Sequence, residues 1–269
     1  MAGKLAGKVV FITGAARGQG RSHAVRLAHE GADIIAVDVC GPLPNLQYAS
    51  ATPDDLAQTV KEVEALDRRI VAREADVRDR DAMASAIADG VAELGRLDVV
   101  VANAGICIIK PWDQVTPEIF QEIMDINLTG VWNTLQLAAP YLIDAGGGSM
   151  IITSSAAGLK GQPFLSPYAA SKHAVVGLMR AYAHELAEHH IRVNTIHPTG
   201  VNTPMGGMGE SLGSLLADKP KLAAMFANSL PVEVTEPSDI SNAVLFLASD
   251  DSRYVTAHAM AVDAGSTQL

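Results

Sequence analysis

The sequence predicts an α/β fold in which helices cover both faces of a doubly wound parallel sheet. Short apolar runs alternate with segments of helical period along most of the 269 residues. The runs are almost continuously apolar, which is typical of strands buried on both faces. No linker, low-complexity tract or internal repeat divides the chain, and 48% hydrophobic residues suffice for one sizeable core. We therefore expect a single domain over residues 1–269.

Each expected element has a signal of its own. Strands are expected at the β-rich apolar runs Val9–Thr13, Asp33–Asp38, Ile70–Ala75, Asp98–Ala102, Ser149–Thr153, Arg192–His197 and Met260–Val262. Helices are expected between them, near residues 18–30, 54–66, 79–94, 117–145, 167–189 and 237–249. The helix over 117–145 has the clearest start, because Thr116 can cap it and Pro117 suits its first position. Ligands bind at the carboxyl ends of such strands, and the polar and glycine-rich motifs follow those ends.

The composition argues against several classes of protein. A formal net charge of -10 without a Lys/Arg cluster excludes a surface built for nucleic acid or anionic lipid. The two cysteines, Cys40 and Cys107, form no disulfide framework and fit a reducing cytoplasm. The sequence shows no signal-peptide pattern, and no apolar stretch reaches the ~18 residues of a membrane span. No carboxylate–histidine cluster has metal-ligand spacing. We expect a soluble cytoplasmic protein without a metal.

The glycine-rich turn TGAARGQG, residues 13–20, follows the first strand and opens the first helix. Unpaired backbone N–H groups and the helix dipole attract phosphate at such a point. We expect Gly14 to permit the sharp turn, Gly18 to let the backbone approach a ligand, and Gly20 to allow tight helix–sheet packing. Because glycines also serve ordinary turns, the loop alone does not decide between a phosphate site and a plain turn.

The second strand ends in Asp38, 18 residues after Gly20. An acidic residue at about this spacing binds the ribose 2′-hydroxyl of a dinucleotide. Arg17 favours the opposite choice, because a guanidinium in this loop can bind an additional phosphate. Since the carboxylate stands where a 2′-phosphate would lie, we predict NAD rather than NADP.

Three polar side chains, Tyr168, Lys172 and Ser155, form a candidate catalytic set, which Asn127 joins through the family resemblance given below. Tyr168 and Lys172 lie four residues apart on a predicted helix and hence on one face. Pairs at this spacing also occur by chance as surface contacts of little consequence. Here, however, Ser155 follows the fifth strand and Asn103 the fourth. The set therefore predicts a reaction centre next to the dinucleotide.

These motifs resemble those of the short-chain dehydrogenase/reductase family over essentially the whole chain. The matching residues are Thr13, Gly14, Gly18, Gly20, Asn103, Ala104, Gly105, Asn127, Ser155, Tyr168 and Lys172. The resemblance implies a Rossmann fold with seven parallel strands in the order 3-2-1-4-5-6-7. It also implies a homotetramer.

The resemblance assigns a role to each catalytic candidate. Tyr168 is the general base for alcohol oxidation and the general acid for ketone reduction. A free tyrosine has a pKa of about 10, so Lys172 and the cationic nicotinamide are expected to lower the pKa of Tyr168. Lys172 also donates to the nicotinamide ribose, and Ser155 hydrogen-bonds the reacting oxygen. Asn127 helps to hold a water in a proton relay to Lys172.

Further cofactor contacts are implied by the same resemblance. Thr199 departs from the family pattern, which usually has glycine after Pro198, and this leaves the backbone path at the nicotinamide open. The complete set expected to bind NAD is Gly14, Arg17, Gly18, Gln19, Gly20, Asp38, Val39, Asp76, Val77, Asn103, Ala104, Gly105, Tyr168, Lys172, Pro198, Val201 and Thr203.

An insertion at about residues 40–53 makes the second crossover longer than one helix and one strand require. It is either a harmless surface loop or a cover over the adenosine of the cofactor. Together with GRSHAVRLA at 20–28 and HPTGVNTPM at 197–205, it resembles the carveol-dehydrogenase-like subgroup associated with the redox peptide mycofactocin. That resemblance implies an NAD that stays bound between turnovers while electrons leave to a carrier.

The substrate is expected to be a hydrophobic secondary alcohol, carveol-like, or its ketone. A lid is expected over residues 200–230, hinged at the glycine-rich run 206–209. Two alternatives stay open: an NADP-linked ketone or ketoacyl reductase, and a catalytically silent dinucleotide-binding sensor or scaffold. The expected pocket lining is Ile106, Cys107, Ile108, Trp112, Phe164, Leu165 and Met205.

Overall fold

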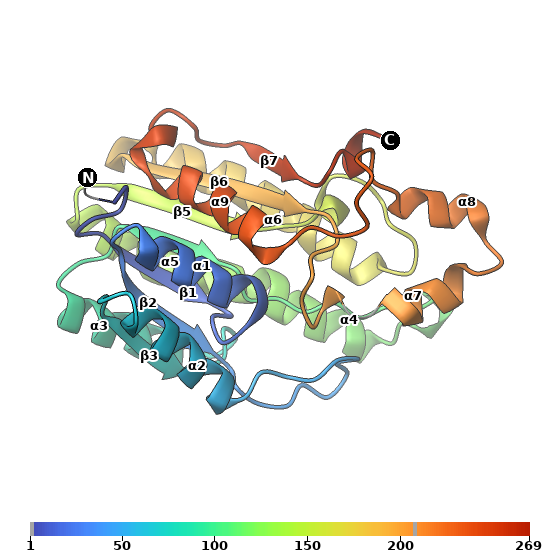
Figure 1. The fold of residues 1–269 in the computed structure, drawn as a ribbon, viewed down its shortest axis with the longest axis horizontal. Coiled ribbons are helices and arrows are strands. Elements are labelled where there is room, and N and C mark those ends of the chain that lie inside the picture. Colours follow the sequence, from blue (N-terminus) through green and yellow to red (C-terminus); the bar gives the residue numbers. More distant parts are fainter. Residues whose placement is uncertain (1–2, 207–208) are drawn as a thin grey trace.

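Seven parallel strands form one sheet in the order β3-β2-β1-β4-β5-β6-β7, as the resemblance implied (Figure 1). The computed structural model describes residues 3–206 and 209–269. The expected strands are all found, with ends shifted by at most one residue. They are β1 (Val9–Thr13), β2 (Asp33–Asp38), β3 (Ile70–Glu74), β4 (Val99–Ala102), β5 (Gly148–Thr153), β6 (Ile191–Pro198) and β7 (Ala259–Val262).

Helices cover both faces of this sheet, so that alternate side chains of each central strand enter different cores. In β1, Val9 and Phe11 pack into one core, whereas Val10 and Ile12 pack into the other. The first core lies under α3 (Arg80–Leu94), α5 (Gly130–Asp144) and α6 (Ser166–Glu185), and the second under α1 (Gly18–His29), α2 (Pro53–Glu64) and α9 (Pro237–Ala248). Burial on both faces explains why these strands are apolar throughout.

The helix expected over 117–145 is interrupted. It consists of α4 (Pro117–Met124), a π-helical turn over Asp125–Thr129, and α5. The predicted cap is present, since the Thr116 hydroxyl accepts a hydrogen bond from the N–H of Ile119. Asn127 lies within the π turn and is fully buried. Single π turns inside α-helices are frequent at functional sites.

Two segments extend beyond the carboxyl ends of the strands (Figure 1). One is the insertion between β2 and α2, which contains no helix or strand in its described residues. The other is the segment after β6, with the short helices α7 (Gly209–Leu216) and α8 (Pro220–Ala223), which the sequence analysis did not predict. Gly207 and Met208, part of the expected hinge, lie outside the described residues. None of the described helices is both long and apolar enough to cross a membrane.

Candidate active site

The glycine-rich turn places the amino end of α1 against the end of β4. Gly14 has a φ of +67°, and a Cβ on it would lie 2.9 Å from the Cα of Ala104. A Cβ on Gly20 would lie 1.9 Å from the carbonyl oxygen of Gly14, which confirms the expected tight packing. Gly18 also has a positive φ, of +55°. In the described chain no side chain caps the start of α1, so its first N–H groups are available to an anion.

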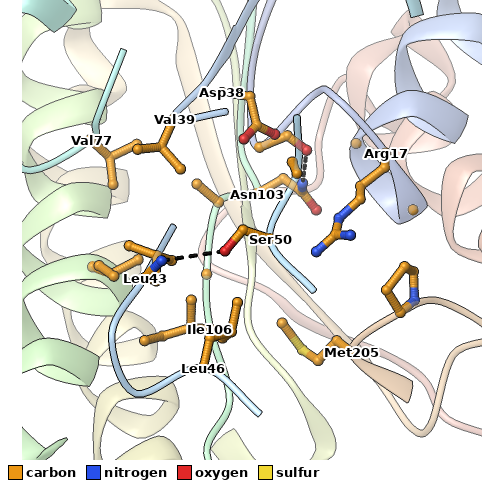
Figure 2. Close-up of a pocket in the computed structure, with 18 of the residues that line it drawn as sticks. Arg17, Asp38, Val39, Leu43, Leu46, Ser50, Val77, Asn103, Ile106 and Met205 are labelled. Carbon is orange, nitrogen blue, oxygen red and sulfur yellow. Dashed lines mark hydrogen bonds between the residues drawn. The ribbon is translucent and has the colours of Figure 1, made fainter. Parts of the chain in front are cut away.

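A cavity that is partly open to solvent lies beside this turn (Figure 2). Most of the residues expected to bind the cofactor line it. They are Gly14, Arg17, Gly18, Gln19, Gly20, Asp38, Val39, Asp76, Val77, Asn103, Ala104, Gly105 and Thr203.

Four expected cofactor contacts do not line this cavity, namely Tyr168, Lys172, Pro198 and Val201. Pro198 ends β6 and is buried, and Val201 is buried in the core under α1 and α9, with a backbone bridge to Thr235. Thr199, which departs from the family pattern, donates a hydrogen bond of 2.9 Å to the side-chain oxygen of Asn228. The segment after β6 is therefore fastened to the chain near residues 228–235, and only Thr203 of the expected trio reaches the cavity.

Asp38 is almost fully buried at the end of β2. Its carboxylate accepts hydrogen bonds from the backbone N–H groups of Ala16, at 3.0 Å, and Cys40, at 3.3 Å. Burial raises the pKa of Asp38 above its ordinary value, while these backbone N–H groups and Arg17 oppose that rise. The side chain is thus held in place beside the glycine turn by the backbone on either side.

The insertion forms one wall of the cavity, which sequence reasoning located only as a surplus of residues. Its contributions are Gly41, Leu43, Leu46, Tyr48, Ser50 and Ala51. Leu43 and Leu46 face the cavity on the side of Val77 and Ile106, and Arg17 lies across from them (Figure 2). The insertion therefore lines the cavity, while its expected place over the adenosine stays a prediction.

Polar contacts fasten the insertion at several points. The guanidinium of Arg17 donates a hydrogen bond to the backbone carbonyl of Ala49. The side chain of Gln47 accepts from the N–H of Ile109 at 2.6 Å and donates to the carbonyl of the same residue at 3.2 Å. Asn45 donates to the carboxylate of Glu122 at 2.6 Å. Because Arg17 is hydrogen-bonded to the insertion, it is less available to bind a 2′-phosphate.

Asn103 joins the ends of three neighbouring strands. Its amide nitrogen donates to the carbonyl oxygens of Thr13, at 3.1 Å, and Gly14, at 3.3 Å. Its side-chain oxygen accepts from the hydroxyl of Thr153 at 3.3 Å. The carbonyl of Thr153 in turn accepts from the ammonium of Lys172 at 2.7 Å. A continuous run of hydrogen bonds thus connects the glycine turn with Lys172.

Lys172 and Asn127 both lie close to Gly105. A Cβ on Gly105 would lie 3.4 Å from the ammonium nitrogen of Lys172 and 3.3 Å from the side-chain oxygen of Asn127. That oxygen accepts from the N–H of Ile106 at 2.8 Å, and the Asn127 amide donates to the carbonyl of Ile106 at 2.9 Å. Burial lowers the pKa of Lys172 to about 8.

Tyr168 and Ser155 meet beside this cluster, while the lowered pKa expected for Tyr168 beside Lys172 and a cationic nicotinamide stays a prediction. Burial raises the pKa of Tyr168, and Cys107 adds to the increase, while a side-chain hydrogen bond with Ser155 opposes it. Lys172 lies 5.6 Å from the centre of the Tyr168 ring and donates to Thr153. Desolvation is therefore the largest influence on the pKa of this phenol.

His197 supports Ser155 and was missed by sequence reasoning, which passed over the histidine before Pro198. It is fully buried, and its Nδ1 lies 2.8 Å from the carbonyl oxygen of Ser155. Its Nε2 lies 2.8 Å from the hydroxyl of Thr195. Burial lowers the pKa of His197 to about 4, so the ring is neutral. A neutral ring that donates through Nδ1 and accepts through Nε2 satisfies both contacts.

An apolar cluster lies next to Tyr168. Cys107, Ile109 and Leu165 are buried there, and Tyr48, Phe164, Tyr168, Met205, Leu212, Leu215 and Phe226 pack against them. Cys107, Phe164, Leu165 and Met205 were expected at this place. Two other expectations were wrong, because Ile108 belongs to the main core and Trp112 is 84% exposed. In the described part of the chain, no three His, Cys, Asp or Glu side chains come together to hold a metal ion.

The fold and this site together define an oxidoreductase of the dinucleotide-binding type. The family model for short chain dehydrogenases matches residues 8–210, and the chain belongs to that family. A (-)-trans-carveol dehydrogenase of Rhodococcus erythropolis is 47% identical, over 98% of this chain and 99% of that protein.

Two solved structures are similar throughout their length, and both proteins are described with NAD. One is a short chain dehydrogenase of Mycobacterium paratuberculosis bound to NAD, with 56% identity, a TM-score of 0.97, and coverage of 99% of this chain and 100% of that one. The other is carveol dehydrogenase of Mycobacterium avium in complex with NAD, with 51% identity, a TM-score of 0.94 and the same coverage.

Proposed function

We propose that this protein is an NAD-dependent dehydrogenase that converts a hydrophobic secondary alcohol, carveol-like, into its ketone. The observation that carries the proposal is the meeting of Tyr168, Ser155 and Lys172 beside an apolar cluster, with Lys172 next to Gly105 of the cavity wall. The similar proteins named carveol dehydrogenase support the substrate class. The reverse reaction, ketone reduction, uses the same groups.

The residues of the cavity suit a dinucleotide. The uncapped start of α1 and the close approach permitted by Gly14 and Gly18 suit a pyrophosphate. The side-chain oxygen of Gln19 is buried at the cavity without a hydrogen-bond partner in the described chain, and a ligand hydroxyl can supply the missing donor. The buried carboxylate of Asp38 favours ribose hydroxyls over a 2′-phosphate. When bound, NAD supplies the acceptor for the hydride that leaves the alcohol carbon.

The protein groups manage the proton of the reaction. Tyr168 takes the hydroxyl proton of the alcohol during oxidation and returns it during reduction. Ser155 hydrogen-bonds the same oxygen, and His197 fixes the backbone of Ser155 from behind. Because burial raises the pKa of Tyr168 in the protein alone, the phenolate requires positive charge nearby, which Lys172 and a cationic nicotinamide supply. Asn127 and Lys172 can hold a water between them for proton transfer.

We further propose that NAD stays bound between turnovers and that electrons leave to a redox carrier such as mycofactocin. The contacts that support this are those of the insertion, through Arg17 with Ala49 and through Gln47 with Ile109, which hold one wall of the cavity in place.

A cytoplasmic homotetramer is the proposed form of the enzyme. Light scattering after size exclusion tests the tetramer.

Mass spectrometry of the small molecule carried through purification tests the proposed cofactor. We expect NAD in near-stoichiometric amount, reduced by a hydrophobic secondary alcohol and reoxidised by an artificial acceptor. Weak NAD binding with rapid turnover on free NAD alone would contradict retention. A preference of the parent protein for NADP would favour a reductase instead. Loss of the NAD preference in Asp38→Ala, without turnover of any alcohol by the parent protein, would favour a sensor.

A further inference from the structure

Tyr48 in the insertion reaches from the cofactor cavity to the catalytic cluster. It lines the cavity, and its ring packs against the same buried group of Cys107, Ile109 and Leu165 that contacts Tyr168. The insertion is therefore part of the proposed substrate site as well as of the cofactor site. Among the residues of this segment, Tyr48 alone belongs to both sets in the described structure.

The hydroxyl of Tyr48 is buried, and it has no hydrogen-bond partner among the described residues. The backbone N–H of Cys107 lies near the hydroxyl oxygen. Burial raises the pKa of Tyr48, so the hydroxyl keeps its proton and can donate. A buried hydroxyl without a partner is unfavourable, and the oxygen of a bound ligand can supply the missing acceptor.

The residues on both sides of Tyr48 are fixed to the rest of the protein. Gln47 makes two hydrogen bonds with the backbone of Ile109, and the carbonyl of Ala49 accepts from Arg17. The phenol is therefore positioned before any substrate arrives, and little order has to be gained on binding. Such preorganisation is what makes a single polar group effective in selecting a ligand.

We propose that Tyr48 determines specificity, by donating a hydrogen bond to a second oxygen on the substrate. On this proposal, which rests on the proposed function, the preferred substrates are hydrophobic secondary alcohols with a further ether, hydroxyl or carbonyl oxygen. The reacting oxygen is served by Ser155 and Tyr168. The remaining wall of Cys107, Ile109 and Leu165 offers no other side-chain hydroxyl for that second oxygen.

The test compares matched ligands in Tyr48→Phe and in the control Tyr254→Phe, whose side chain is 89% exposed. Cyclohexanone is paired with tetrahydropyran-4-one and tetrahydropyran-3-one, and cyclohexanol with the corresponding alcohols. Calorimetry measures ketone binding to the NAD-loaded protein, and single-turnover reduction of the bound nicotinamide measures kcat/KM. Thermal unfolding of each variant is recorded in parallel.

We expect the parent and Tyr254→Phe to bind at least one oxygen-bearing ketone about tenfold more tightly than Tyr48→Phe does, with cyclohexanone unchanged. The unfolding midpoint of Tyr48→Phe should be unchanged or raised, because no partner loses a hydrogen bond. Equal effects on both ligand classes, no effect on either, or a lowered midpoint would overturn the proposal. Discrimination in binding without oxidation of any alcohol would reject the proposed reaction while the Tyr48 contact stands.

Discussion

If NAD stays bound between turnovers, as we propose, replacement of Gln47 by alanine should make the cofactor exchangeable. Gln47 makes two hydrogen bonds with the backbone of Ile109, at 2.6 Å and 3.2 Å. A hydrogen bond contributes about 0.5–1.5 kcal/mol net, so the two together hold the insertion closed by about 1–3 kcal/mol. If cofactor release requires the insertion to open, the release rate in Gln47→Ala should rise by about 5- to 150-fold.

The assay is the rate at which excess NAD displaces bound NADH, followed by the loss of NADH fluorescence in a stopped-flow instrument. Gln58→Ala is the matched control, because Gln58 makes one exposed hydrogen bond with Glu62 on α2, outside the residues that line the cavity. The control should release NADH at the parental rate. An unchanged rate in Gln47→Ala, or an equal increase in both variants, would refute the reasoning that the insertion limits release.

Three further predictions follow from the site and the core. Tyr168→Phe should lower the single-turnover rate of alcohol oxidation by about 10²- to 10⁴-fold while NAD binding, measured by calorimetry, is retained; unchanged turnover would reject the assigned acid/base. Gly20→Ala should unfold at clearly lower urea concentration than Gly161→Ala, because the new Cβ at position 20 would lie 1.9 Å from a carbonyl oxygen whereas that at 161 meets no described atom within 4 Å. His23 and His197 are buried, and burial lowers their pKa values from 6.5 to about 3 and about 4. Because the unfolded chain takes up these protons first, the free energy of unfolding should fall as pH drops from 6.5 towards 4, by about 1.4 kcal/mol per pH unit for each histidine; a flat profile in urea titrations over this range would contradict the assignment.

The strands and the glycine turn could be predicted because their signals are local. An entirely apolar run such as Val9–Thr13 predicts a buried strand by itself. The crowding around Gly20 follows from the position at which a helix has to begin after a strand. The π turn at Asp125–Thr129 could not be found in this way. Over five residues, the spacing of apolar side chains does not distinguish a π turn from an α turn. The sequence therefore predicted one continuous helix over 117–145.

The contacts of the insertion could not be predicted for a different reason. Sequence length identified a surplus after Asp38, but the partners of Gln47 and Asn45 lie 62 and 77 residues away. Pairing at such distances depends on the assembled sheet. The pKa of Tyr168 shows a related limit, because a sequence displays the neighbouring charge of Lys172 but not how deeply the phenol is buried.

The hydrogen bonds of Asn103 connect the glycine turn of the cofactor cavity with the strand end that holds Lys172. One side chain holds the turn at Gly14 and, through Thr153, the strand end to which Lys172 is fastened. A substitution of Asn103 should therefore weaken nucleotide binding in one assay and slow the chemical step in another. Variants at this position need measurements of both nucleotide affinity and the rate of the chemical step. Neither measurement alone would show that both effects come from the loss of one side chain's hydrogen bonds.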